Sequence, residues 1–514
     1  MDIWLRWLVL ACVVYLSQSY KILGVFPHVG LSHFIVMRPL MKELANRGHE
    51  VTVLSHFPLQ QKIPRYKDIS LSGTIPILVE ELNLEHYYDS SRLLRYRTVF
   101  ELDEFAEMVC QGIYGSGRLN EVLQSSDKYD LIIVEMFNSD CLLPINSKIN
   151  APIVGISSCF LLPWLYERFG IPHNPSYIPH VSMNYPKNMN FFERLENTVV
   201  SWISRLYYSH WRNEKDNRIA RRYFKENIPH VSEFANNASL ILVNTHFSIN
   251  NAFPYPPNVI EVGGIHLPAE TEALPEKIEK FIEESPEGVI FFSLGSMVKS
   301  DTLPLEKREV FLRTFARLPQ RVLWKWENET LPDKPNNVMI QKWMSQFDIL
   351  SHPNVVAFIC HGGLLGIMEA VQNGVPMLLM PHRADQFTNA KAVEDNGGGT
   401  ILQMKDVDDE SLYGKLKRIL HPEFKAKARA LSSRFMDRPM SPMDTAVYWV
   451  EYVARHKSAT HMRTAAVDMP FYQYLLLDVI AFLIAIIFIS MYIVYKVAHS
   501  FLRIKRATQK VKLN

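Results

Sequence analysis

The sequence predicts an α/β protein of two doubly wound domains in series, followed by one membrane-spanning helix. Three observations lead to this fold class. A strand–helix–strand pattern opens the chain, the same alternation restarts after residue 288, and an apolar stretch of 21 residues occupies 475–495. A chain of 514 residues is also too long for one ordinary core, which favours two domains.

The composition is that of a folded protein without a nucleic-acid partner. Hydrophobic residues make up 48% of the chain and charged residues 21%, which excludes a disordered chain. The net charge is only +2 and the body has no long basic stretch, so we expect no nucleic acid to bind.

The first 19 residues are predicted to be a secretory signal peptide. Arg6 precedes the apolar run Trp7–Leu16, and the polar Ser17–Ser19 follows it. The alternative is an uncleaved anchor, for which the apolar run is short.

Residues 20–262 are predicted to form the first domain. The run at 21–26 is a buried strand, 34–46 has apolar residues at helical spacing, and 50–55 is the next strand, so the sheet should be parallel. Further buried strands are expected at 129–137, 151–158 and 238–245. The segment 188–227 is rich in aromatic and basic residues. It either lies along a membrane surface, roofs an apolar pocket, or forms ordinary amphipathic helices on the sheet.

A polar linker at 263–287 is predicted to lead into a second domain at 288–440. Its strands are expected at 288–295, 321–326, 338–343, 355–361, 375–381 and 399–404. Ligands bind at the carboxyl ends of the strands in such sheets, so two facing sheets would enclose a ligand-binding cleft.

The chain is predicted to end in a helix and stalk (441–470), a transmembrane helix (475–495) and a basic tail (496–514). The apolar stretch has one charge, Asp478, and at about 1.5 Å per residue it crosses a hydrocarbon core of roughly 30 Å. The tail has six Lys or Arg residues and no acid. The positive-inside rule therefore places the tail in the cytoplasm and the body in a lumen, as a single-pass type I protein.

Other signals agree with a lumenal body. The last five residues, KVKLN, resemble the di-lysine signal that returns membrane proteins to the endoplasmic reticulum. Asn237 and Asn328 begin glycosylation sequons. The four cysteines outside the signal peptide lack metal-binding spacing, and Cys360 should be a buried thiol. A disulfide among the other three, Cys110, Cys141 and Cys159, is left open.

Three loops of the second domain follow predicted strands and carry polar residues. They contain Ser296, the His361–Gly363 turn, and the pair Asp385 and Gln386. The turn opens a helix, whose free N–H groups suit a diphosphate. Glu369 should lie on the same helix face about 10 Å along, where it can accept hydrogen bonds from ribose hydroxyls.

The frame around this turn carries a resemblance to a known family. From Trp343 to Gln386 the chain spans 44 residues, with Gln346, the His-Gly-Gly turn, Glu369 and Asp385 between them. This pattern resembles the nucleotide-sugar signature of the UDP-glycosyltransferases. The stretches "VIFFSLGSMV" and "GIPHNPSYIP", with the apolar helix and basic tail, resemble the membrane-bound animal branch, in an invertebrate-like form.

The resemblance implies a GT-B fold of two Rossmann-like domains facing a cleft. It also implies an inverting transfer from a UDP-sugar co-substrate that needs no metal or other cofactor. The second domain would bind the UDP-sugar, with Trp343 on uracil and Gln346 and Glu369 on the ribose or base edge. The diphosphate would meet Ser296, His361, Gly362 and Gly363, and the sugar hydroxyls would meet Asp385 and Gln386.

The catalytic base would come from the first, acceptor-binding domain. His33 matches the family's catalytic histidine, and a neutral imidazole suits removal of a proton near pH 7. His28 does not match and is interpreted as structural. Glu135 is the best match for the partner acid, with Asp140 as the alternative, and the acid would orient His33 and stabilise its imidazolium.

The donor sugar is predicted to be glucose. Leu364 and Leu365 replace a Ser-Asn pair of vertebrate drug-conjugating members, which removes a donor for the carboxylate of glucuronate. His382 and Arg383 favour UDP-glucuronate instead, because a cation near the sugar can pair with a carboxylate.

The acceptor is predicted to be small and lipophilic. The aromatic residues Phe160, Trp164, Phe169 and Phe191 suit a flat phenol or polyketide, although a sterol would also suit them. Transfer to oxygen or to carbon, a lipid acceptor, a non-catalytic subunit and a homo-oligomer are left open.

Overall fold

The structure is a computed structural model that describes residues 19–87, 92–225 and 228–511. Residues up to Arg463 form one compact unit, and those from Thr464 onward form a second. The predicted signal peptide, apart from Ser19, lies outside the described residues, as does Lys512 of the predicted retrieval signal.

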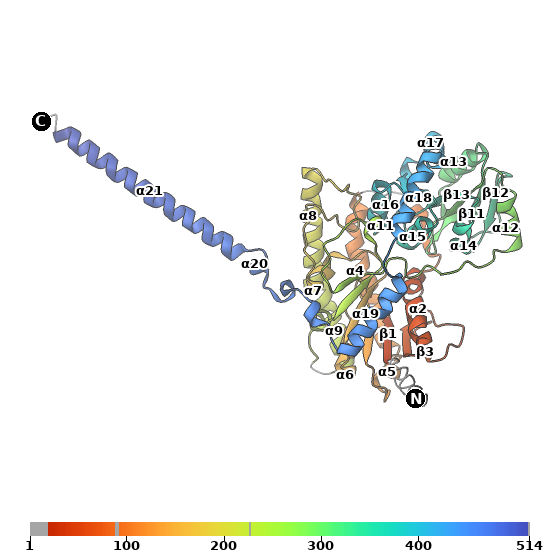
Figure 1. Ribbon diagram of the computed structural model, residues 1–514, viewed down its shortest axis with the longest axis horizontal. Coiled ribbons are helices and arrows are strands. Elements are labelled where there is room, and N and C mark those ends of the chain that lie inside the picture. Colours follow the sequence, from red (N-terminus) through yellow and green to blue (C-terminus); the bar gives the residue numbers. More distant parts are fainter. Residues whose placement is uncertain (1–18, 88–91, 226–227, 512–514) are drawn as a thin grey trace, which may run out of the picture. The chain divides into compact units, whose positions relative to one another are not determined.

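Within the described residues, the first half of the large unit contains a seven-stranded parallel sheet (Figure 1). β1 is an interior strand and pairs with β2 and β5, so that Val25 is level with Leu54 and Val134. The spatial order is β3 (Tyr66–Ser70), β2 (Glu50–Ser55), β1 (Lys21–Phe26), β5 (Leu131–Glu135), β6 (Ile153–Ser157), β7 (Leu240–Val243) and β8 (Val259–Glu261). All five strands predicted in this half are confirmed.

The helices of this half lie in the connections between the strands and cover the sheet. They are α2 (Leu31–Asn46), α3 (Leu84–Tyr87), α4 (Arg92–Gly115), α5 (Asn120–Leu123), α6 (Asn146–Ile149), α7 (Tyr166–Phe169), α8 (Phe191–Leu206), α9 (Asn213–Phe224), α10 (Val231–Asn236) and α11 (Phe247–Asn250). Short 3-10 turns lie at Leu143–Ile145 and Pro163–Leu165, and a π-helical segment, η3 (Tyr207–Arg212), joins α8 to α9.

The second half contains a six-stranded parallel sheet in the described residues, and its six predicted strands are confirmed. The order is β12 (Val338–Gln341), β11 (Arg321–Lys325), β9 (Val289–Ser293), β13 (Val355–Cys360), β14 (Met377–Leu379) and β15 (Gly399–Ile401). Its helices are α12 (Glu276–Glu283), α13 (Leu305–Ala316), α14 (Gln346–Ser351), α15 (Leu364–Gln372), α16 (Gln386–Asp395), α17 (Asp409–Leu420) and α18 (Pro422–Met436), with 3-10 turns at Ser300–Thr302 and Met404–Asp406.

Two segments connect the halves. β4 (Leu82–Asn83) belongs to the first half by sequence but pairs with β10 (Val298–Lys299) of the second. The helix α19 (Pro442–His456) follows the second half and returns to α2 (Figure 1). Its buried residues join the core beneath the first sheet; they are Ala446, Val447, Val450, Val453 and Ala454. A 3-10 turn at Thr460–Met462 follows.

The second unit consists mainly of helix. It contains a 3-10 turn at Ala465–Asp468, α20 (Phe471–Tyr474) and α21 (Leu477–Val511). Over Leu477–Thr508, α21 is long and apolar enough to cross a membrane, by length and composition. This helix includes almost all of the predicted transmembrane stretch.

Candidate active site

His33 lies beyond the carboxyl end of β1, an interior strand of the first sheet. β1 ends at Phe26, a short loop follows, and His33 is the third residue of α2. Its imidazole stacks on His28, with ring centres 3.5 Å apart and planes 8° apart. The edge of Phe137 covers another side at 4.8 Å. His28, interpreted from the sequence as structural, thus forms part of the wall that holds His33.

Glu135 reaches the same point because β5 is the neighbour of β1. It is the last residue of β5, and its Oε1 lies 2.5 Å from His33 Nδ1. Ser158, which follows β6, places Oγ 2.9 Å from the same nitrogen. Three adjacent parallel strands therefore deliver His33, Glu135 and Ser158 together. Ser158 was not among the residues expected from the sequence, although its place at the end of a predicted strand was a usable signal.

Burial disfavours charge on both members of the His33–Glu135 pair. It lowers the pKa of His33 to about 3 and raises the pKa of Glu135 to about 7. The imidazole is therefore neutral near pH 7. Because Nδ1 faces Glu135, Nε2 is the nitrogen that remains to accept a proton from a bound molecule.

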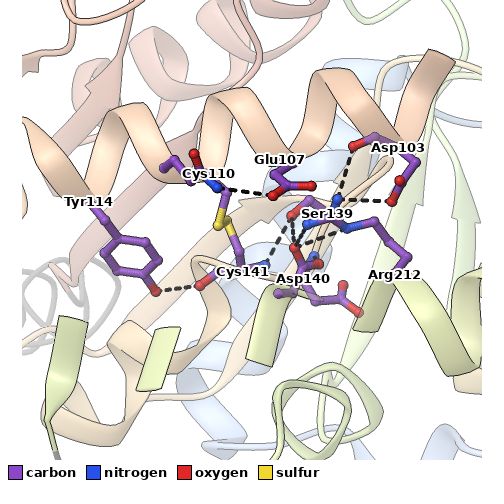
Figure 2. Close-up of a disulfide and its surroundings, with 10 residues drawn as sticks. Asp103, Glu107, Cys110, Tyr114, Ser139, Asp140, Cys141 and Arg212 are labelled. Carbon is purple, nitrogen blue, oxygen red and sulfur yellow. Dashed lines mark hydrogen bonds and ion pairs between the residues drawn. A yellow bond between two sulfur atoms is a disulfide. The ribbon is translucent and has the colours of Figure 1, made fainter. Parts of the chain in front are cut away.

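Asp140, the alternative acid, has different partners. Both of its carboxylate oxygens accept hydrogen bonds from Arg168, and its backbone N–H donates to Asp216 at 2.9 Å. Arg212 pairs with Asp216 and, at 3.0 Å, with Asp103 (Figure 2). Asp140 thus belongs to a buried network of alternating charges, whereas the structure brings Glu135 to His33.

A disulfide lies beside this network. Cys110 of α4 is bonded to Cys141 of the loop after β5, and the Tyr114 hydroxyl donates to the Cys141 carbonyl (Figure 2). Cys159 and Cys360 are free. The Asp216 carboxylate comes within 4.8 Å of both bonded sulfur atoms. Sulfur atoms joined to each other are not thiolate ligands, so this group does not resemble a metal site.

A small cavity lies next to the His33–Glu135 pair and is largely apolar. Its wall includes His28, Glu135, Phe105, Val109 and Phe137. The four aromatic residues expected from the sequence to line an acceptor pocket do not gather there. Phe160, Trp164 and Phe169 are buried in the core of the first half, where large rings fill volume, and Phe191 is exposed.

In the second half, the predicted donor-site residues follow the carboxyl ends of neighbouring strands. Ser296 follows β9, His361 follows β13, and Trp343 follows β12. Asp385 and Gln386 follow β14, at the start of α16. Because β12, β11, β9, β13 and β14 are consecutive in the sheet, these loops lie along one edge.

The His-Gly-Gly turn holds His361 between two glycines. A Cβ on Gly363 would lie 2.4 Å from Nε2 of His361, and one on Gly295 would lie 2.7 Å from Cε1. Gly362 has φ +84°, a left-handed conformation that glycine adopts readily. The turn therefore brings the Ser296 loop, His361 and the first N–H groups of α15 together.

His361 has a buried ring nitrogen, Nδ1, that lacks a hydrogen-bond partner among the described residues. Burial lowers the pKa of His361 to about 4, so its ring is neutral. A buried polar atom without a partner is costly. A phosphate oxygen at the start of α15 would accept this hydrogen bond.

Gln346 and Glu369 form a second polar pair in this half. Gln346 Nε2 donates to Glu369 Oε2 at 2.6 Å, and burial raises the pKa of Glu369 to about 7. Trp343 lies at the end of β12 with 61% of its surface exposed, so a flat base can stack on it.

Asp385 and Gln386 are held by their own loop. Asp385 accepts a hydrogen bond from Asn389 at 2.9 Å. The side-chain oxygen of Gln386 accepts from the backbone N–H groups of His382 and Arg383, at 2.8 and 3.1 Å. This oxygen therefore braces the turn, and the amide NH₂ of Gln386 is the group that can bind a ligand.

The fold and these two groups of residues define a class, the GT-B glycosyltransferases. Solved structures with this architecture are similar over nearly their whole length. One is the glycotransferase of kitacinnamycin, with TM-score 0.56, 16% identity and coverage of 85% of this chain and 99% of that chain. Another is LpCGTa in complex with UDP, with TM-score 0.53, 17% identity and the same coverage.

Sequence comparison gives the family. The profile described as "UDP-glucoronosyl and UDP-glucosyl transferase" matches residues 21–512. UDP-glycosyltransferase UGT5 of Dactylopius coccus is 44% identical, over 96% of this chain and 94% of the relative. UDP-glucuronosyltransferase 1A3 of Rattus norvegicus is 32% identical, over 95% and 93%. The chain therefore belongs to the UDP-glycosyltransferase family, and the protein is an enzyme of that family.

Proposed function

We propose that the enzyme transfers glucose from UDP-glucose to a small lipophilic acceptor with a phenolic or polyketide hydroxyl, with inversion at the sugar carbon. The observation that carries the choice of glucose concerns the loops that lead into α15 and α16. Among the residues that the structure describes there, no side chain offers a free cation to the carboxylate of a hexuronate. Leu364 is buried, and Leu365 packs on the core of the first half. Neither supplies a hydrogen-bond donor.

The two residues that favoured glucuronate in the sequence are poor partners for a carboxylate. Burial lowers the pKa of His382 to about 3, so its imidazole is neutral. Arg383 already forms an ion pair with Glu101 at 3.5 Å. A relative named UDP-glucosyltransferase 2, from Dactylopius coccus, is 39% identical over 97% of both chains, which also favours glucose.

The proposed reaction is one displacement at C1 of glucose. Nε2 of His33 takes the proton of the acceptor hydroxyl, the oxygen forms a bond to C1, and the bond from C1 to the β-phosphate oxygen breaks. Glu135 holds the ring and stabilises the imidazolium that forms. The first N–H groups of α15, with His361 and Ser296, stabilise the negative charge on the departing UDP.

The rest of the donor is held by residues along the same sheet edge. We propose that Trp343 stacks on uracil, that Gln346 and Glu369 bind the ribose, and that Asp385 and the NH₂ of Gln386 bind sugar hydroxyls. No metal or other cofactor is required by this scheme. We further propose that α21 crosses the endoplasmic reticulum membrane, with the catalytic body in the lumen and the basic tail in the cytoplasm.

The test is a donor-by-acceptor screen on microsomes that contain the full chain. UDP-glucose and UDP-glucuronate are each supplied with a panel of phenols, polyketides, sterols and membrane lipids, and products are identified by mass spectrometry. We expect hexosyl products on phenolic or polyketide acceptors. Hexuronosyl products alone would overturn the assignment of glucose as the donor sugar. Products on lipids alone would overturn the proposed acceptor class, and the absence of product with every pair would favour a non-catalytic subunit.

The matched variant for this screen is His33→Ala. We expect transfer to fall at least about 100-fold, the usual contribution of a general base, while UDP binding is retained because the donor half is unchanged. Retained UDP binding shows that the variant is folded. Full turnover by His33→Ala would remove His33 from the mechanism.

A further inference from the structure

The helix α8 is attached to the protein by its polar side. The residues of α8 that are buried are Asn197, Ser201, Ser204 and Arg205. Asn197 donates to the carbonyls of Pro175 and Ile178, both at 2.7 Å, and accepts from the His180 N–H at 2.7 Å. A surface helix of a soluble protein normally buries its apolar stripe, so α8 has the reverse orientation.

The opposite side of α8 is an exposed apolar stripe. From Phe192 to Leu206 its residues follow one another at spacings of three or four, which places them on one face of the helix. Phe192 at the start is 76% exposed, and Ile203 near the end is 56% exposed. The exposed apolar residues of this stripe are Phe191, Phe192, Leu195, Val199, Ile203, Leu206 and, in η3, Trp211. A contiguous apolar stripe exposed on a protein surface marks an interaction site.

The continuous helical segment formed by α8, η3 and α9, called the rod below, becomes basic at its C-terminal end. α8, η3 and α9 are contiguous from Phe191 to Phe224 (Figure 1). The exposed charged residues from α9 to its C-cap are Glu214, Arg218, Arg221, Arg222 and Lys225, so bases outnumber acids four to one. Glu214 lies 3.3 Å from His230, which leaves the basic groups dominant at this end.

We propose that the rod α8–η3–α9 lies on the surface of a bilayer that contains anionic lipids. The apolar stripe of α8 inserts at the boundary of headgroups and acyl chains, and the bases of α9 contact lipid phosphates. Trp211 and Tyr207, whose rings stack with centres 5.9 Å apart, are the residue types that favour the membrane interface. This surface is a second membrane contact, in addition to any span by α21.

Two observations favour lipid over a second copy of the chain. The chain contains a helix able to cross a membrane, and the connecting residues 464–476 reach at most about 45 Å, so a bilayer would be present at high local concentration. The basic end also repels an identical basic surface, whereas anionic headgroups neutralise it.

The test is site-specific photo-crosslinking of the full chain in vesicles of phosphatidylcholine and phosphatidylserine. Benzoylphenylalanine is placed at Ile203, or at Leu305 of α13 as the control, because Leu305 is equally exposed at 57% and lies in the other half. We expect about tenfold more lipid adduct at Ile203 than at Leu305. Equal lipid adducts, or crosslinks between two chains at Ile203 in place of lipid, would overturn the proposal.

Two further variants test the stripe and the bases separately. The first is made in the chain that carries benzoylphenylalanine at Ile203, and it combines Leu195→Glu with Val199→Glu. This double substitution should remove most lipid adducts and leave UDP affinity unchanged, because neither residue touches the donor site. Arg218→Glu with Arg222→Glu should remove the preference for vesicles that contain phosphatidylserine. Unchanged adducts in the first variant would overturn insertion of the stripe, and an unchanged lipid preference in the second would overturn the role of the bases.

Discussion

At the scale of single residues, Glu135 ends β5, and Asp140 lies five positions later in the following loop and has different partners. Glu135 contacts His33, and Asp140 is paired with Arg168. We expect Glu135→Gln to lower kcat on the order of 100-fold or more with little change in stability, because the amide keeps the shape but not the charge that stabilises the imidazolium.

The matched variant Asp140→Asn should act on stability instead. It leaves the buried Arg168 without its counter-charge, which should cost about 3–5 kcal/mol of unfolding free energy. Both variants are compared by thermal unfolding and by kcat at saturating UDP-glucose. A stable Asp140→Asn enzyme with a collapsed kcat would contradict this division of roles.

A second prediction at this scale concerns the pH dependence of UDP binding. Burial raises the pKa of Glu369 to about 7, and the ionised carboxylate accepts ribose hydroxyls better than the protonated form. Binding should therefore favour the deprotonated group, so affinity should rise as the pH increases towards 7 and level off above it. The measurement is the Kd of uridine or UDP by calorimetry across this range.

The control for the pH prediction is Glu369→Gln, which cannot titrate at this position. Its uridine affinity should be weaker and independent of pH. A wild-type affinity for uridine that does not change between acidic and alkaline pH would show that Glu369 does not contact the ribose.

Much of the site could be predicted from residues because its members follow predicted strands. His33, Glu135, His361 and the Asp385 loop all occupy the carboxyl ends of strands with strongly apolar sequences. The sequence favours Glu135 over Asp140, but it does not show the ion pair that occupies Asp140, because Arg168 lies 28 residues further along the chain. Likewise, Cys110 and Cys141 are 31 residues apart, and this spacing does not indicate that they form a disulfide.

At the scale of elements, the strand-to-helix turn at the start of α15 is tightly packed. Gly363 has no room for a side chain because Nε2 of His361 would lie 2.4 Å from its Cβ. Gly363→Ala should therefore displace His361 and weaken UDP binding by about tenfold, the effect of losing one good hydrogen bond to a charged group.

The control for this turn is Gly414→Ala in α17. Gly414 lies inside a helix with nothing within 4 Å of an added Cβ. This change should leave UDP binding intact and stabilise the fold by about 0.5–1 kcal/mol, because alanine is the better helix former. Both variants are measured by UDP calorimetry and thermal unfolding. Normal UDP affinity in Gly363→Ala would contradict the placement of His361 at the diphosphate.

Elements with strong apolar runs were predictable, and the two edge strands of the first sheet were not. β3 reads YKDIS and is mostly half-exposed, and β8 has only three residues, so neither shows the pattern of a buried strand. β4 and β10 have two residues each and exist only because the halves meet. Their pairing depends on tertiary structure, which a local pattern does not contain.

At the scale of the whole molecule, the two halves form one catalytic unit. α19 joins the core of the first half after the chain has completed the second, and Thr388 of α16 donates to the carbonyls of Val181 and Met183, both at 2.7 Å. The proposed base on the first sheet and the proposed donor-binding residues on the second are thereby held within one compact unit. This arrangement suits a reaction in which acceptor and donor come from different halves.

The central claim is that His33 assists one direct displacement on UDP-glucose, and the anomeric configuration of the product tests it most directly. The full chain is supplied with UDP-glucose labelled with carbon-13 at C1 and with an acceptor from the screen, and the product is examined by NMR. Because the donor is α-linked, one displacement gives a β-glucoside, with a large coupling between H1 and H2. An α-glucoside would contradict the account, because it requires two displacements or attack from the same face.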